Sequence, residues 1–172
     1  MNEWGPRTYG DPCAGCGFSW KASLATIGSN IDNAAVEFES LVAGRTGSER
    51  MASLAWSVQA YVWHAGDNLR IWAERLVGAA SGGIHPVPRY DQNQLAAARG
   101  YEVMPVDAAL WSLARAIGDW QEALRMIGER SDVALEHPAM GSYTVADVTR
   151  QVGHDLVHHL DDLRRILSHQ YP

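Results

Sequence analysis

Three shortages in the sequence each exclude a class of protein. Two of the 172 residues are cysteine, which is too few for a four-cysteine zinc site within one chain. Fourteen basic residues against twenty acidic ones give a net charge of −6, which argues against a nucleic-acid partner. No apolar run approaches ~18 residues, so we expect no membrane-spanning segment.

The start of the chain also lacks the marks of an export signal. The segment MNEWGP has neither a basic stretch nor an apolar one. We therefore expect a cytoplasmic protein in which both cysteines are thiols. The composition, 47% hydrophobic and 20% charged with seven tryptophans, is typical of a globular chain of one domain.

Apolar residues recur at spacings of three and four in four separate segments, which predicts four amphipathic helices. Ser57 is a candidate N-cap for the second segment, and Thr144 with Asp147 forms a capping-box-like pair at the start of the fourth. The third begins near Pro105, a residue that a first helical turn tolerates. The predicted helices cover residues 19–43, 57–80, 105–129 and 144–168.

Four helices of this length, each with one apolar face, predict an all-α four-helix bundle. No comparable window alternates with period two, so we expect no sheet. The long connection from Ala80 to Met104, between the second and third helices, holds a short predicted helix at 92–99. It forms either a lid or pocket wall, or simply a crossover along the bundle. We assign residues 1–18 to an irregular N-terminal segment and residues 19–172 to the bundle.

The fourth predicted helix carries two competing pairs of metal-ligating side chains. One pair is His154 with His158. The other is Asp155 with His159. In each pair the two residues are four positions apart, so they share one face of the helix. On a wheel of about 100° per residue, Asp155 and His159 fall beside the apolar stripe and the first pair falls on the opposite side. Ligands in a bundle project inward, so the wheel favours Asp155 with His159 and places the other pair outside.

The second predicted helix supplies a third ligand. His64 lies about 120° from the centre of its stripe, again beside the apolar face. His64, Asp155 and His159 together make a three-ligand site, which leaves a position for water or substrate, as in catalytic zinc centres. The alternative is that these polar groups bond only to water or to neighbouring helices.

Cys13 and Cys16 form a CxxC motif in the N-terminal segment. Such a motif is a redox pair, half of a zinc site, or simply two thiols. No βαβ pattern surrounds it, which excludes a thioredoxin-like domain. As part of a second metal site the pair would need ligands such as His85 or His137, or a partner copy. Alternatively, the segment folds over the bundle mouth and brings a thiol near His64.

Three segments of the chain resemble the DinB/YfiT-like superfamily. They are WSVQAYVWH at 56–64, the helix start Thr144-Val145, and HDLVHHLDDL at 154–163. The resemblance runs through the predicted bundle in order and implies a metal-binding four-helix bundle. The last helix is also similar to the mycothiol-dependent maleylpyruvate isomerase branch, in which a carboxylate, three residues, a histidine and two residues precede Asp-Leu.

That pattern implies specific ligands. Asp155 and His159 occupy its carboxylate and histidine positions, and the ligand on the second helix maps to His64. Asp155 is shorter than the glutamate of the branch. His154 or His158 is therefore the alternative ligand if the helix is rotated.

Two further carboxylates are candidates for orienting the ligand rings from behind. Asp162 begins the Asp-Leu of the pattern, and Asp67 follows His64 by three residues. The alternative for both is solvated helix surface.

The resemblance implies a divalent-metal-dependent enzyme that uses a mycothiol-like low-molecular-weight thiol as an S-transferase or isomerase on a small electrophile. A metal ion lowers the pKa of a bound thiol and holds it as the nucleophilic thiolate. Zinc suits imidazole and carboxylate ligands, with nickel, iron and manganese as alternatives. Related bundles often form dimers, so a homodimer is an open alternative. The competing hypothesis is a non-catalytic bundle that binds a metal or small molecule for stress response or sequestration.

Overall fold

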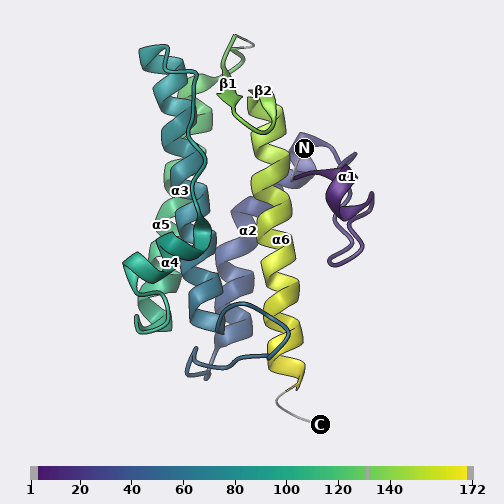
Figure 1. Cartoon of the computed structure of the whole chain (residues 1–172), viewed down its shortest axis with the longest axis vertical. Helices are drawn as coiled ribbons and strands as arrows, with labels where there is room; N and C mark the ends of the chain where they lie inside the picture. The colour runs from purple at the N-terminus through teal and green to yellow at the C-terminus, as the bar shows by residue number, and fades with distance from the viewer. Residues whose placement is uncertain (1–3, 131, 170–172) are drawn as a thin grey trace.

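The computed structural model describes residues 4–130 and 132–169, and four long helices dominate it. In Figure 1 these helices lie side by side along the long axis of the molecule. Helices α3 and α2 each pack against both α5 and α6. The four are α2 (Leu24–Val42), α3 (Val58–Gly82), α5 (Val106–Ile127) and α6 (Val145–His169).

The helix starts follow from local capping. Ser57 caps α3 by accepting from the Ala60 amide, as predicted. At the start of α6, the Thr144 amide donates to the Asp147 carboxylate at 3.1 Å and the Asp147 amide donates to the Thr144 hydroxyl at 3.2 Å. This reciprocal pair confirms the predicted capping box. The first long helix begins at Leu24 rather than residue 19 because Ser23 caps it.

The apolar stripes meet in one core between the four helices. Phe38, Leu69 and Leu113, from three different helices, are each fully buried. On α6 the stripe of Val152, Leu156 and Leu163 is also buried, which confirms the bundle predicted from periodicity. None of the helices in the described part of the chain is long and apolar enough to cross a membrane.

A small hairpin corrects the expectation that no sheet forms. Strands β1 (Ala134–His137) and β2 (Gly141–Thr144) pair in antiparallel register just before α6. Each strand has four residues, which is too short for alternation to be recognised in the sequence. The connection between α3 and α5, called the crossover below, bonds to this hairpin, since the Val87 amide donates to the Glu136 carbonyl at 3.0 Å. It then continues into the short helix α4 (Gln92–Arg99), at the residues predicted.

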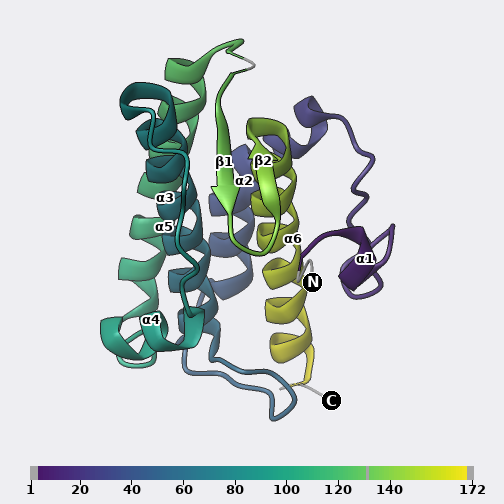
Figure 2. The same ribbon diagram turned by 45° about the horizontal axis from the view of Figure 1, so that its top comes forward.

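The N-terminal segment lies along the side of α6 that faces away from α3 (Figures 1 and 2). It holds one short helix, α1 (Pro6–Tyr9), followed by turns. Cys13 and Phe18 are 3% and 5% exposed, so the segment extends the core across α6 rather than projecting into solvent. Helix α6 is therefore covered by this segment as well as by α2 and α3.

Helices α2 and α6 approach closely at Gly153. A β-carbon there would lie 2.4 Å from Cγ2 of the buried Ile27. We predict that Gly153→Ala lowers the free energy of unfolding by about 1–3 kcal/mol, because overpacking outweighs the better helix propensity of alanine. A β-carbon at Gly118, on the exposed face of α5, would meet no neighbouring group within 4 Å.

Gly118→Ala is therefore the matched control. It removes a glycine from a helix interior without a clash, so it should raise the free energy of unfolding by up to about 1 kcal/mol. Urea denaturation followed by circular dichroism measures both variants. Equal stabilisation by the two substitutions would contradict the close packing of α2 on α6.

Candidate metal centre

The structure brings the three predicted ligands together between α3 and α6. Their ligand atoms all lie within 4.8 Å of one another. Nε2 of His64 lies 3.5 Å from one oxygen of Asp155, and Nε2 of His159 lies 3.6 Å from the other. Asp155 and His159 are one helical turn apart on α6, so the helix itself aligns them.

The charges at this site depend on burial. Asp155 is 3% exposed. Burial raises the pKa of this carboxyl, but electrostatic attraction to His159 and His64 and hydrogen bonding to both rings outweigh that effect, so the pKa lies well below its usual range. Burial also lowers the pKa of His159, and the carboxylates of Asp155 and Asp162 raise it to about 9. The site is therefore organised around a buried anion.

The carboxylate of Asp162 and the amide of Asn68 hold the His159 ring and the Asp155 carboxylate in place. Nδ1 of His159 lies 3.0 Å from the Asp162 carboxylate, which is where the sequence predicts an orienting group. The amide nitrogen of Asn68 donates to Asp155 at 2.5 Å. Sequence reasoning missed Asn68. It lies four positions after His64, and that spacing, which places both on one face of α3, is the signal that identifies it.

The donor set fits a divalent metal. Two imidazole nitrogens and a carboxylate are ligands that zinc accepts. The two nitrogen–oxygen separations of 3.5 and 3.6 Å are close to the spacing of about 3.3–3.5 Å between ligands around one tetrahedral ion. Nδ1 of His64 is buried and has no hydrogen-bond partner among the described residues. The ligand atoms thus face one another at a spacing suited to a shared ion.

A cavity of about 650 Å³ opens at this site. The buried side chains of His64, Asn68 and Asp155 are among those that line it. Tyr90, from the crossover, lines it as well and donates to the Asn68 side chain at 3.4 Å. Of the two alternatives for the crossover, the structure therefore supports the pocket wall.

Asp67 lies elsewhere, which corrects its predicted role beside the ligand rings. Its carboxylate accepts from Arg70 at 2.6 Å and from Arg99 at 2.7 Å, and the Tyr101 hydroxyl also donates to it. Adjacent residues on a helix point about 100° apart, so Asn68 faces the site while Asp67 faces α4 and the turn after it that holds Tyr101. The carboxylate is buried and serves to join these elements.

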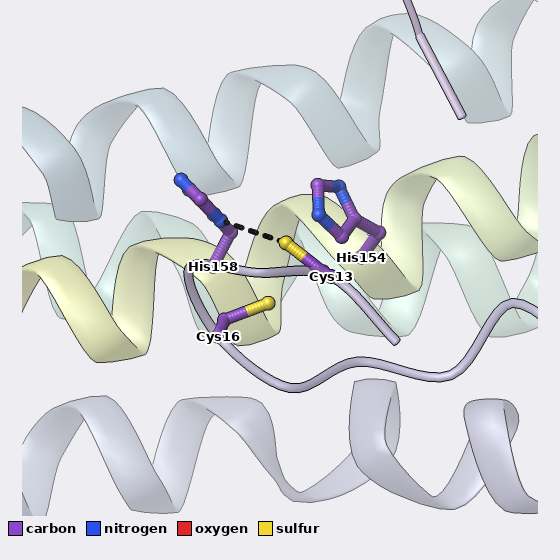
Figure 3. A group of neighbouring side chains, drawn as sticks. All are labelled: Cys13, Cys16, His154 and His158. Atoms are coloured by element: carbon purple, nitrogen blue, oxygen red, sulfur yellow. Dashed lines mark hydrogen bonds between the residues drawn. The ribbon is translucent and has the colours of Figure 1, made fainter. Parts of the chain in front are cut away.

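His154 also differs from its predicted position. The wheel places it on the outside, but its side chain is 1% exposed, because Tyr9 and Phe18 of the N-terminal segment pack against its ring. Cys13 and Cys16 lie beside His154 and His158 (Figure 3), and not with His85, His137 or His64, the partners that the sequence left open. His85 instead bonds to the Ala134 carbonyl at 2.7 Å.

Comparison with known proteins bears on both the fold and the centre. The family model of the DinB superfamily matches residues 30–163, which is most of the chain. The chain belongs to the DinB superfamily. No curated protein matches it. The matched region contains all of α3 and the α6 ligands, so the candidate centre lies within the DinB part of the chain.

A solved structure shows the same fold as this DinB chain. YfiT from Bacillus subtilis, described as "a probable metal-dependent hydrolase with an unusual four-helix bundle topology", superimposes with a TM-score of 0.71 at 16% identity. The match covers 84% of this chain and 87% of YfiT. The expected DinB/YfiT-like four-helix bundle is therefore confirmed, whereas no match singles out the mycothiol branch.

Substitution of the two buried aspartates, Asp162 and Asp67, distinguishes a residue that orients a metal ligand from one that stabilises the fold. We predict that Asp162→Asn weakens metal binding by about 10–100-fold, because His159 loses the acceptor that fixes its ring. Asp67→Asn should instead lower the free energy of unfolding by about 2–3 kcal/mol, because a charged acceptor of three hydrogen bonds is lost. Metal titration and urea denaturation of both variants test this. Weaker metal binding by Asp67→Asn at equal folding would contradict the assignment.

Proposed function

We propose that this DinB protein is a divalent-metal-dependent enzyme that transfers or adds a low-molecular-weight thiol, such as mycothiol, to a small electrophile. The observation that carries the proposal is a three-ligand set of which two members, His64 and Asp155, line a cavity of about 650 Å³. Three protein ligands leave coordination positions for a substrate, which a closed structural site does not. The cavity is large enough for a thiol and a small second substrate.

Some residues of the site would hold the metal ion, and others orient the side chains that hold it. His64, Asp155 and His159 would hold the ion, and when bound it would keep a thiol in its nucleophilic thiolate form. Asp162 accepts from Nδ1 of His159, which leaves Nε2 directed at the ion's position. Asn68 holds one oxygen of Asp155, so the carboxylate cannot rotate freely.

Aromatic rings fix the two imidazoles from the outer side. The Trp56 ring lies 4.8 Å from that of His64, and the Tyr61 ring lies 4.9 Å from that of His159, measured between centroids. Both aromatic residues are buried. Their packing excludes water from one side of the ligands, so the open side is the cavity. Zinc suits this ligand set, with nickel, iron and manganese as alternatives that metal analysis distinguishes.

Arg75 gives the cavity a site for an anionic group. Its guanidinium lies 4.6 Å from the Trp72 ring centroid, and one of its nitrogens donates to the Pro88 carbonyl at 2.6 Å. The other terminal nitrogen is buried and has no hydrogen-bond partner among the described residues. A carboxylate on the electrophile would supply that partner.

A hydrolase is the second candidate, and the description of YfiT favours it. The same three ligands would then serve an attacking water in place of a thiol. The two reactions differ in one requirement that an assay detects directly, which is the added thiol. A bundle that only binds or sequesters a metal would show neither reaction.

The first test is turnover by the metal-loaded protein. We expect consumption of monochlorobimane or an unsaturated carboxylic acid that requires both added thiol and metal. His64→Ala and His159→Ala should each lower kcat/KM by at least about 100-fold, because the metal contributes several kcal/mol. Gly118→Ala should retain full activity. Hydrolysis of an ester without thiol would favour the hydrolase, and metal binding without any turnover would contradict an enzymatic role.

The second test concerns substrate charge. We predict that Arg75→Met raises KM for a carboxylate-bearing electrophile by about 10–100-fold, since a hydrogen bond to a charged group contributes about 1.5–3 kcal/mol. The methyl ester of the same compound is the control and should be affected far less. Equal effects on acid and ester would show that Arg75 only supports the crossover.

A further inference from the structure

Four side chains outside the candidate centre form a second group of metal-ligating atoms. Cys13 and Cys16 from the N-terminal segment meet His154 and His158 from α6 (Figure 3). One ligand atom from each of the four lies within 4.8 Å of all the others. Sγ of Cys13 is 3.8 Å from Nδ1 of His158. Two segments about 140 positions apart in the chain therefore bring two thiols and two imidazoles to one point.

The CxxC turn is built to present both sulfurs to α6. The Gly17 amide donates to the Cys13 carbonyl at 2.8 Å, and the Cys13 amide donates to the Phe18 carbonyl at 2.8 Å. Gly17 has a φ of 74°, the left-handed conformation that this tight turn requires. Gly15 passes so close to His158 that a β-carbon would lie 2.9 Å from the ring. The backbone thus lies directly against the histidine that it faces.

His154 is the observation that points to a ligand. Its side chain is 1% exposed, yet neither ring nitrogen has a hydrogen-bond partner among the described residues. The rings of Trp20, Tyr9 and Phe18 surround it at centroid distances of 4.5, 4.7 and 5.4 Å. A buried polar group without a partner is costly and rare in folded proteins. A metal ion would give His154 the bond that the protein does not.

We propose that Cys13, Cys16, His154 and His158 form a second, structural metal site that binds zinc. A tetrahedral Cys₂His₂ site places its ligand atoms about 3.3–3.8 Å apart, so the four atoms need to close by about 1 Å around the ion. All four positions would be filled by protein, so no position is left for a substrate. This site goes beyond the proposed function, because it shares no ligand with the centre formed by His64, Asp155 and His159.

The second ion would tie the N-terminal segment to α6. Tyr9 of that segment lies over His154 and also lines the cavity at the candidate centre. Metal binding at the Cys₂His₂ site is therefore coupled to the position of one wall of the cavity. His158 and His159 are adjacent in the chain with ring centroids 6.0 Å apart, so the two sites lie on neighbouring faces of one helix.

The second site contains two cysteine thiolates and the candidate centre contains none. The absorption spectrum of bound cobalt distinguishes the two. We expect the reduced wild-type chain to bind about two zinc or cobalt ions. The cobalt form should show thiolate-to-metal charge-transfer absorption in the near ultraviolet, with intense tetrahedral bands in the visible. Cys13→Ser with Cys16→Ser should lose one ion and the charge-transfer band, whereas His64→Ala should lose the other ion and keep the band. If the centre at His64 bound no metal, the proposed function would fail, but the proposal of a Cys₂His₂ site would still hold.

A measurement on the unmodified chain covers the case in which the cysteine variant does not fold. Titration of wild-type zinc protein with a mercurial thiol reagent should release about one zinc ion per chain, in step with two thiols. Two reactive thiols with no zinc release would overturn the proposal. So would a Cys13–Cys16 disulfide in metal-loaded protein, which would show a redox pair, or a cobalt spectrum that lacks the charge-transfer band.

Discussion

The buried carboxylate of Asp155 is the constraint on which the arrangement of α3 and α6 depends. An anion that is 3% exposed is very costly unless its charge and its lone pairs are matched where it lies. Two imidazoles, from His64 and His159, and the Asn68 amide meet that requirement from two helices. The same attraction that makes the carboxylate tolerable holds α3 and α6 in register. A divalent ion between these ligands would neutralise the same charge more completely.

Helix α6 joins two environments of different chemistry. One face carries the acidic and imidazole ligands beside the cavity, and the neighbouring face carries His154 and His158 beneath the N-terminal segment. The close contact at Gly153 brings α2 against the same turn of α6. A shift of α6 would therefore disturb both clusters and the α2 interface at once. The fold positions the functional groups by holding this one helix from three sides.

Much of the bundle is predictable because its signals are local. Periodic apolar residues and the caps at Ser57 and Thr144 place the helices to within a few residues. The wheel also places Asp155 and His159 at the edge of the core. It fails for His154, because a wheel describes one helix, and the segment that buries this side chain lies far away in the sequence. The choice between Asp67 and its neighbour Asn68 depends likewise on which helix each one faces.

The most direct test is a crystal structure of the protein grown with zinc, with anomalous difference maps above and below the zinc absorption edge. We predict a zinc peak about 2.0–2.2 Å from Nε2 of His64, Nε2 of His159 and an oxygen of Asp155. That result would show that the buried carboxylate is a metal ligand. Zinc-grown crystals in which Asp155 contacts only the two imidazoles and Asn68, with no peak between them, would contradict it. The charge cluster would then be structural.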